Sequence, residues 1–488
     1  MTIITTSPFI GRKKELKQLQ SLLQKSSASL IVLRGRRRIG KSRLIEEFSK
    51  QFTHVHIFSG IPPTEKTTIQ DQLHEFGWQL GKSLGEPAFK DNDWNDLFLR
   101  LGKRTRRGKT LILLDEISWM GSKDPDFLGK LKNAWDLEFK KNPHLVMVLC
   151  GSVSSWIEKN ILNNTGFLGR ISLKLDLEEL PLFDCNRFWL KWGEEISAYE
   201  KFKILAVTGG VPKYLEEIKP QLPAEENIRQ LCFEKSGLLF NEFDQIFSDV
   251  FGQRSPIYKE IVQCITNGFF EYEEIYEKLG VDKSGVIGDY LEDLVTSGFL
   301  RRDYTWHLKN GKSSKLSHFR ISDNYLRFYL KYILPNKEKI LRNGLSQVSL
   351  TLLPQWEIIM GLQFENLVLN NRQKIQSVLG IKPEEIVYDN PFFQRKTLRQ
   401  EGCQIDYLIQ TRYDNLFVCE IKFSRQLVQA SIIAEMQQKL RRLKAPRHIS
   451  KRPVLIHVNG VSNEILESQY FSNIIDFCQL LGKESNNS

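Results

Sequence analysis

The chain has 488 residues, of which 41% are hydrophobic, and it carries a formal net charge of +11. That length and apolar content predict about three packed domains and exclude a disordered chain. Basic residues gather at 100–109 (RLGKRTRRGK) and 436–452 (MQQKLRRLKAPRHISKR), and such clusters favour polyanions over small acidic metabolites, although either could also be a solvated face.

The cysteines and the apolar runs indicate the compartment. The seven cysteines are odd in number and form no CxxC pair, so they predict neither a disulfide framework nor a zinc site. The longest apolar runs, such as LVMVLC at 145–150, are too short to span a bilayer, and the N-terminus has no apolar core of signal-peptide length. We expect a cytoplasmic protein without a membrane partner.

Residues 29–48 (SLIVLRGRRRIGKSRLIEEF) predict a buried strand, a glycine-bounded loop and the start of a helix. Within them, Gly35-x4-Gly40-Lys41-Ser42 matches the phosphate-binding loop of nucleotide-binding proteins. Backbone N–H groups of such a loop wrap the phosphates, Lys41 reaches the β and γ phosphates, and the Ser42 hydroxyl ligates Mg²⁺. The residues predicted to contact ATP here are Gly35, Arg36, Arg37, Arg38, Ile39, Gly40, Lys41, Ser42 and Arg43.

Two further strands end in polar residues. KTLILLDEISWM (109–120) ends in Asp115, predicted to hold the magnesium shell, and Glu116, predicted to polarise the attacking water. HLVMVLCGSVSSWI (144–157) ends near Ser152, which could sense the γ-phosphate. In GFLGR (166–170), Arg170 is a candidate charge stabiliser that acts within the subunit or on a neighbour, and an ordinary surface arginine is the alternative.

Six motifs occur in order along the first 240 residues: FIGRKKEL (9–16), GRRRIGKSRL (35–44), LILLDEIS (111–118), LCGSVSSWI (149–157), GFLGR, and TGGVPKYLEEI (208–218). Together they resemble the archaeal-type ATPase family within the STAND and AAA+ P-loop proteins. The resemblance implies ATP binding, with FIGR near the adenine and GGVPKYL in a helical lid. The three consecutive arginines of the loop depart from the general pattern, and their side chains could contact DNA or only solvent.

The middle of the chain changes rhythm near residue 254. Residues 176–245 are helical in period and suit a lid, whereas 254–322 predict three amphipathic helices and two strands around Asn310-Gly311. That order is typical of a winged helix-turn-helix, with Ser284 as a cap of the recognition helix. Winged helices often bind DNA, but Asp289, Glu292 and Asp293 on this helix leave a protein-contact role equally open. The aromatic-rich stretch 322–340 predicts a core-packing helix.

The segment 351–488 alternates helices and strands: a helix within 360–370 (MGLQFENLVLN), then IVYDNPFFQ, IDYLIQ and LFVCEIKFS, the helix QLVQASIIAEMQQKL, and RPVLIHVNG at 452–460. This order predicts a small α/β/α fold with a mixed sheet. Period two places Val418, Glu420 and Lys422 on one face. Two buried carboxylates need a compensating cation, and acidic oxygens suit Mg²⁺. Asp406-x13-Glu420-x-Lys422 therefore predicts metal-dependent phosphodiester hydrolysis, with a buried ion pair as the alternative.

This arrangement resembles the PD-(D/E)XK nuclease superfamily. The resemblance implies that Asp406 and Glu420 bind metal, that Lys422 handles the water, that Glu365 is an auxiliary metal-site acid on the first helix, and that Gln437 is a polar residue on the following helix. An inactive relative could instead retain the acids in a salt bridge with Lys422.

The predicted fold class is α/β: a P-loop NTPase parallel sheet with a helical lid, a winged helix, and a C-terminal α/β/α restriction-endonuclease-like domain. The expected boundaries are 1–175 for the ATPase core, 176–250 for the lid, 251–322 for the winged helix, 323–350 for a helical connector and 351–488 for the nuclease-like domain. The expected function is ATP hydrolysis coupled to action on DNA, with ATP and Mg²⁺ as cofactors and a homo-oligomer as a possible assembly. The alternative is an ATP-dependent regulatory switch whose inactive nuclease fold docks on DNA or protein.

Overall fold

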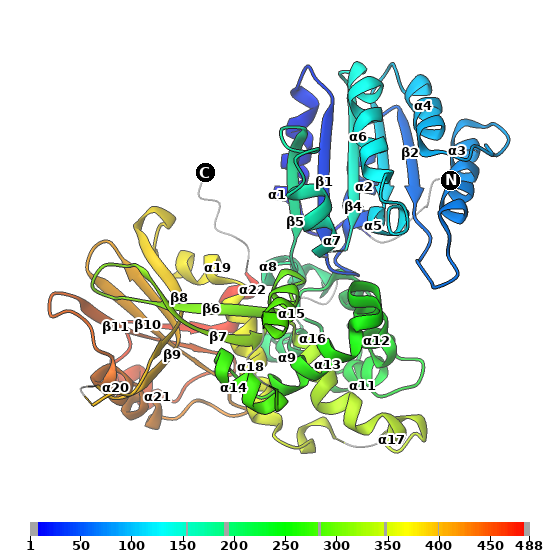
Figure 1. The fold of residues 1–488 in the computed structure, drawn as a ribbon. Helices are drawn as coiled ribbons and strands as arrows, with labels where there is room; N and C mark the ends of the chain where they lie inside the picture. The colour runs from blue at the N-terminus through cyan, green and yellow to red at the C-terminus, as the bar shows by residue number, and fades with distance from the viewer. Residues whose placement is uncertain are drawn as a thin grey trace. The chain divides into compact units, whose positions relative to one another are not determined.

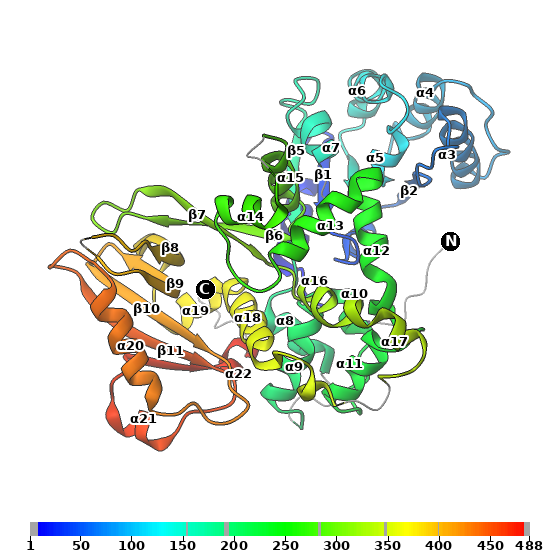
Figure 2. The same cartoon turned by 60° about the horizontal axis from the view of Figure 1, so that its bottom comes forward.

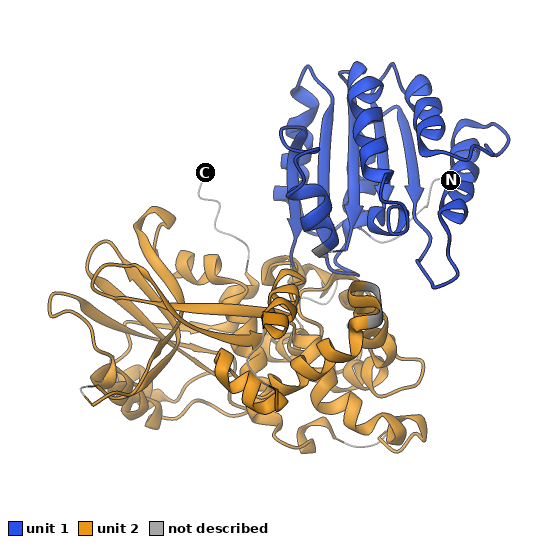
Figure 3. Ribbon diagram, viewed as in Figure 1, with its two compact units in different colours: residues 1–178 blue, residues 179–488 orange. Residues whose placement is uncertain are grey.

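The computed structural model describes residues 8–152, 155–189, 195–281, 285–345, 349–398 and 400–482 (Figure 1). The chain divides into two compact units, residues 1–178 and residues 179–488 (Figure 3). The expected lid, winged helix, connector and C-terminal segment thus all fall largely within unit 2. Among the described residues no helix is both long and apolar enough to cross a bilayer.

Unit 1 contains a parallel five-stranded sheet with the strand order β2-β3-β4-β1-β5. Its strands are β1 (Ser29–Gly35), β2 (His54–Ser59), β3 (Thr110–Asp115), β4 (Leu145–Gly151) and β5 (Ile171–Leu177). The inner strands β1, β3 and β4 are almost entirely buried, which explains their near-continuous apolar sequences. The three strands expected from the sequence are confirmed.

The helices of unit 1 connect these parallel strands and cover the sheet. They are α1 (Lys13–Ser21), α2 (Lys41–Ser49), α3 (Ile69–Leu84), α4 (Trp94–Arg104), α5 (Ile117–Met120), α6 (Phe127–Leu137) and α7 (Ser155–Ile157). Helix α3 begins with a capping box, in which Thr68 accepts from the Asp71 N–H and Asp71 accepts from the Thr68 N–H. Phe58 of β2 and Trp94 of α4 both contact Phe76 of α3, so aromatic rings fix these helices on one face of the sheet.

Unit 2 begins with a helical region, as the period of 176–245 predicts. Its helices are α8 (Leu182–Cys185), α9 (Ala198–Thr208), α10 (Pro212–Glu216), α11 (Ala224–Cys232) and α12 (Leu238–Phe251). The aromatic stretch that follows the winged-helix segment forms α16 (Asn324–Phe328), a π-helical turn at Tyr329–Ile333, and α17 (Lys337–Leu341). Tyr325, Phe328 and Tyr329 are fully buried, which confirms the core-packing role expected for this stretch.

Three helices and a hairpin occur at 255–321 in the expected order. They are α13 (Ser255–Cys264), α14 (Tyr272–Leu279), α15 (Gly285–Thr296) and the antiparallel strands β6 (Leu300–Trp306) and β7 (Ser313–Ile321). Ser284 lies outside the described residues. Two acids of α15 are used within the segment: Asp293 accepts from the Tyr258 hydroxyl at 2.6 Å, and Glu292 pairs with Arg302 at 2.8 Å.

The C-terminal sheet has the strand order β12-β11-β10-β9-β8. Its strands are β8 (Ile386–Gln394), β9 (Cys403–Thr411), β10 (Asn415–Lys422), β11 (Ser450–His457) and β12 (Asn473–Asp476), and its helices are α18 (Trp356–Leu369), α19 (Arg372–Val378), α20 (Ser431–Arg442), α21 (Asn463–Ser468) and α22 (Phe477–Leu481). Strands β8, β9 and β10 are antiparallel, whereas β11 and β12 run parallel to β10. The expected mixed sheet is confirmed.

The β6–β7 hairpin packs against this C-terminal sheet (Figure 2). Trp306 donates to Gln410 of β9 at 2.6 Å and stacks on Tyr388 of β8, while the Gln410 amide donates to the Leu308 carbonyl. At the hairpin tip, a Cβ added to Gly311 would lie 2.5 Å from the side chain of Val387. The β6–β7 hairpin is therefore a packed part of the C-terminal core.

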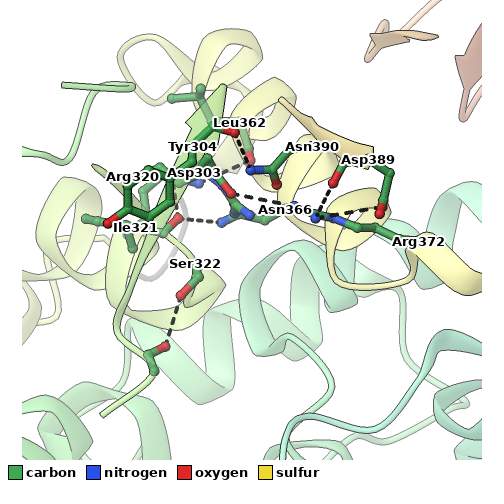
Figure 4. A network of polar contacts seen from close by, with 12 residues as sticks. Asp303, Tyr304, Arg320, Ile321, Ser322, Leu362, Asn366, Arg372, Asp389 and Asn390 are labelled. Carbon is green, nitrogen blue, oxygen red and sulfur yellow. Dashed lines mark hydrogen bonds and ion pairs between the residues drawn. The ribbon is translucent and has the colours of Figure 1, made fainter. Parts of the chain in front are cut away.

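A buried polar network ties the hairpin to the C-terminal helices (Figure 4). Arg320 of β7 donates to Asp303 of β6 and to Asn366 of α18, each at 2.6 Å. Arg372 of α19 lies 3.5 Å from Asp303 and donates to the Asp389 backbone carbonyl. Asp303 and Arg320 are only 3% and 2% exposed, so water cannot solvate either charge if its partner is lost.

We expect Asp303→Ala to destabilise unit 2 by about 3–5 kcal/mol, because it leaves the Arg320 guanidinium buried without a carboxylate. Urea unfolding followed by far-UV circular dichroism measures this loss. Glu292→Ala is the matched control, since it breaks a pair whose carboxylate is 57% exposed and should cost less than about 1 kcal/mol. Equal midpoints for the two variants would show that the network contributes no more than a surface pair.

Candidate functional sites

The predicted phosphate-binding loop connects β1 to α2. Lys41 is buried, and its ammonium donates to the carbonyls of Gly35 (2.9 Å) and Arg36 (3.1 Å), which closes the loop around it. Gly40 adopts φ of 91°, a conformation that favours glycine, and a Cβ on Gly35 would lie 2.9 Å from the Leu177 carbonyl. The first N–H groups of a helix have no partner within it, so the start of α2 suits a phosphate.

Ser42 and Asp115, which are 73 residues apart in sequence, meet at this loop. The Ser42 hydroxyl donates to a carboxylate oxygen of Asp115 at 3.4 Å, and the other Asp115 oxygen accepts from the Glu116 N–H at 3.1 Å. A hydroxyl and a carboxylate side by side are hard oxygen donors of the kind that Mg²⁺ takes beside a nucleotide. The donor set therefore fits a magnesium ion held by Ser42 and Asp115.

Ser152 follows β4, which lies between β3 and β1 in the sheet. It is buried, and among the described residues its hydroxyl has no hydrogen-bond partner. An unsatisfied buried hydroxyl is unfavourable unless a ligand or water completes it. Ser152 thus has spare hydrogen-bonding capacity at this edge of the sheet.

Four arginines lie in and directly after the loop. Arg43 pairs with Glu46 along α2 at 2.9 Å. Arg36, Arg37 and Arg38 are half-buried, and Arg38 has a positive φ of 68°. Contact between these side chains and nucleic acid stays a prediction.

Two arginines that sequence reasoning missed brace the loop. Arg12 of the FIGR motif is 6% exposed and donates to the Ile39 carbonyl (3.0 Å) and to the Glu178 carbonyl (2.6 Å). Arg34, at the end of β1, forms ion pairs with Asp176 and Glu158. The FIGR motif was the signal available in the sequence. The sequence does not show which carbonyls accept the hydrogen bonds of its arginine.

The register of the sheet constrains Arg170. Strand β5 runs parallel to β1, with Leu30 opposite Ile171 and Gly35 opposite Leu177. Arg170 therefore lies at the opposite end of the sheet from the phosphate loop, roughly 20 Å away at about 3.3 Å per residue. It pairs there with Asp136 at 2.8 Å, and this pairing lowers the pKa of Asp136 to about 2. This distance favours action on a neighbouring subunit over a role within the same subunit, and both roles stay predictions.

The C-terminal acids lie on adjacent strands and share one lysine. Asp406 of β9 accepts from the Ile421 N–H at 2.9 Å. Lys439 of α20 lies 3.6 Å from the other oxygen of Asp406 and forms an ion pair with Glu420. Although burial opposes it, the two carboxylates raise the pKa of Lys439. The two acids thus converge on a single positive charge.

Sequence reasoning assigned the lysine of this site to Lys422. In the structure, Lys422 is 40% exposed and pairs with Glu435 at 3.3 Å, and Gln437 is exposed. Lys439 follows the buried Ile432 and Met436 by seven and three residues, which places it on the inward face of α20. That spacing was the signal that could have identified it.

Glu365 of α18 completes the acidic group. Burial and the charge of Asp406 raise the pKa of Glu365 to about 8, against the opposing effect of Arg327. Burial and Asp406 also raise the pKa of Glu420 to about 7, although Lys439 opposes the change. The described residues include no group of three or more His, Cys, Asp or Glu side chains arranged to hold a metal ion. The donor chemistry of Asp406 and Glu420 still fits a divalent cation, in competition with Lys439.

The pKa of Glu365 predicts a pH dependence of stability. The unfolded chain releases this proton near pH 4.5 and the folded chain near pH 8, so the folded state holds more protons between these values. Stability contributed by Glu365 therefore falls as pH rises from about 4.5 to 8. In EDTA, Glu365→Gln should flatten the decline in urea midpoint between pH 5 and 8, and the exposed Glu384→Gln control should not. A wild-type slope in Glu365→Gln would contradict the assignment.

Comparisons with known proteins show what the N-terminal part of the chain is similar to. Residues 9–218 match the family described as "ATPase domain predominantly from Archaea". An uncharacterized protein of Methanocaldococcus jannaschii is 26% identical over 334 residues, which cover 68% of this chain and 70% of the relative. An uncharacterized ATP-binding protein of the same organism is 42% identical over 52 residues, covering 10% of this chain and 88% of the relative.

Two solved structures are also similar. The Walker-type ATPase of Pyrococcus abyssi has a TM-score of 0.46 at 16% identity and covers 68% of this chain and 99% of its own. The ORC2 protein of Aeropyrum pernix, solved in ADPNP and ADP complexes, has a TM-score of 0.40 at 13% identity and covers 71% and 98%. The segment that matches this ATPase family, residues 9–218, contains the phosphate loop between β1 and α2.

Proposed function

We propose that this chain hydrolyses ATP in unit 1 and acts on DNA through unit 2. The observation that carries the first part is the convergence of Lys41, Ser42 and Asp115 at one loop, in a segment that matches an ATPase family. A bound Mg²⁺ would neutralise charge on the phosphate oxygens. Lys41 would bind the β and γ phosphates, Ser42 and Asp115 would hold the ion, and Ser152 would donate to the γ-phosphate.

Glu116 is the proposed group that orients the attacking water. Its position directly after Asp115, at the carboxyl end of β3, supports this role. We expect Glu116→Gln to retain binding of a fluorescent ATP analogue while it lowers the turnover number at least ~100-fold, because the amide cannot accept the proton. Glu47→Gln, which removes the partner of the exposed Lys50 at the end of α2, is the control. Full turnover in Glu116→Gln would remove this residue from the reaction.

A second proposed activity is Mg²⁺-dependent hydrolysis of phosphodiesters at Asp406 and Glu420. The shared contact of both carboxylates with Lys439, on a three-strand meander followed by a helix and a parallel strand, favours a PD-(D/E)XK-like site. Nicking of supercoiled plasmid in Mg²⁺ tests it. Plasmid binding without nicking would favour the alternative, a regulatory ATPase whose inactive nuclease fold docks on DNA.

We further propose that the protein assembles with itself when it binds nucleotide. Arg170 is too far from its own phosphate loop, so a stabilising role requires a second copy and the opening of its pair with Asp136. Sedimentation velocity with and without a non-hydrolysable ATP analogue tests this proposal, and a monomer under both conditions would exclude it.

A further inference from the structure

A cavity of about 650 Å³ lies beside Asp406. Asp406 and Lys439 form part of its lining. The opposite wall comes from the winged-helix segment, with Glu271 at the start of α14 and His318 on β7. The cavity therefore joins two parts of unit 2 that sequence reasoning treats as separate domains.

The walls of the cavity combine a largely buried aromatic pair, in which Phe393 is 7% exposed, with two arginines. The His318 ring stacks on Phe393, with ring centroids 3.8 Å apart. Arg395 reaches Glu271 at 3.1 Å, and Arg442 reaches Glu401 at 3.0 Å. A flat apolar ring beside guanidinium groups is the combination by which proteins bind single-stranded nucleic acid.

Both arginine pairs are exposed enough to be exchanged. The side chain of Arg395 is 62% exposed and that of Arg442 is 41% exposed. Ion pairs between such exposed groups contribute little stability, whereas a guanidinium binds phosphate through charge-assisted hydrogen bonds. An incoming phosphate can therefore replace Glu401, which is 70% exposed, at small cost. Replacing Glu271, which is 19% exposed and caps α14, costs more.

The same region is poorly suited to a duplex. A cavity of this volume can enclose a ligand of the size of a few nucleotides. A DNA duplex cannot enter such a cavity, because its bases are reached through grooves roughly 6 and 12 Å wide between two backbones. The wing, which would be the second contact to a duplex, packs on β8 and β9 through Trp306 and Gln410. Helix α15 carries Asp289, Glu292 and Asp293 on the element that would enter the major groove.

From these observations we infer that the cavity receives an end of single-stranded DNA. One base lies against Phe393 and His318, Arg395 and Arg442 bind the adjacent phosphates, and the strand leads to Asp406 and Lys439. What happens to the strand there rests on the proposed phosphodiester hydrolysis, but the binding itself does not. The inference gives the winged-helix segment the role of a cavity wall.

Fluorescence anisotropy in EDTA tests the inference without cleavage. A labelled 12-nucleotide single strand should bind the full-length protein at least tenfold more tightly than a blunt duplex of the same sequence. The double variant Arg395→Ala/Arg442→Ala should lose at least tenfold in single-strand affinity and leave duplex affinity within twofold. Phe393→Leu, which keeps an apolar side chain in the sheet, should weaken single-strand binding by about fivefold or more.

Arg412→Ala is the matched control, because Arg412 is an exposed arginine that does not line the cavity. Equal affinities of wild type for single strand and duplex, or unchanged single-strand binding in the double variant, would overturn the inference. Cleavage in Mg²⁺ is measured separately. Loss of the nuclease proposal would appear as absent cleavage with the single-strand preference intact, so the two failures are distinguishable.

Discussion

Lys41→Ala is expected to lower kcat/KM for ATP at least ~100-fold, because it removes the positive charge that the loop presents to the β and γ phosphates. Lys41 is only 7% exposed, so an exposed lysine elsewhere cannot reach its position unless the loop changes conformation. Release of phosphate from ATP in Mg²⁺ measures the effect. Lys50→Ala, at the end of the same helix and on an exposed pair with Glu47, should keep wild-type turnover.

Loss of turnover in Lys41→Ala could also come from an altered loop, since the ammonium holds the carbonyls of Gly35 and Arg36. Lys41→Arg keeps the charge and hydrogen-bond donors but changes their geometry. If phosphate contact is the role of Lys41, both variants lose turnover while their thermal midpoints stay close to wild type. Wild-type turnover in Lys41→Ala would refute the nucleotide site.

Asp406→Asn is expected to reduce Mg²⁺-dependent DNA cleavage at least ~100-fold. The amide oxygen can still accept from the Ile421 N–H, but the substitution removes one of the two charges that would hold the ion. Conversion of supercoiled plasmid to nicked and linear forms measures the rate. Asp414→Asn is a control, because Asp414 lies on the exposed turn between β9 and β10.

A matched pair of lysine variants distinguishes the structural from the sequence-based assignment. Lys439→Met removes the group that contacts both acids, whereas Lys422→Met removes a partner of Glu435. If Lys439 is the functional lysine, its variant loses at least tenfold more cleavage activity than the Lys422 variant. The reverse order would favour Lys422, as the D-x13-E-x-K spacing alone suggests.

Local patterns predicted the elements that carry both sites. Strand β3 is a buried apolar run that ends in Asp115. The loop before α2 combines Lys41 with glycines at fixed spacing. Each of these two elements could therefore be identified from its own sequence alone. Parallel strands end at the same edge of a sheet, and this rule brought Ser42 and Asp115 together in prediction and in structure. On β10, period two placed Val418, Glu420 and Lys422 on one face, and the structure pairs Glu420 with Lys439 of α20.

Contacts between distant segments could not be predicted in this way. Trp306 and Gln410 are 104 residues apart, and nothing in either neighbourhood indicates that the wing packs on the C-terminal sheet. The distance of Arg170 from the loop follows from the direction and register of β5, which its alternating sequence ISLKLDL does not specify. Lys439 was missed because the D-x13-E-x-K pattern directed attention to the strand, while the charge came from the facing helix.

The most direct test asks whether one chain holds two separate sites for phosphate esters. It measures ATP hydrolysis and DNA cleavage in the same Mg²⁺ buffer for wild type, Lys41→Ala and Asp406→Asn. We expect wild type to perform both reactions, Lys41→Ala to lose ATP turnover and retain cleavage measured without ATP, and Asp406→Asn to show the opposite pattern. Wild-type cleavage by Asp406→Asn, or the loss of both reactions in either variant with its fold intact, would contradict the two-site account.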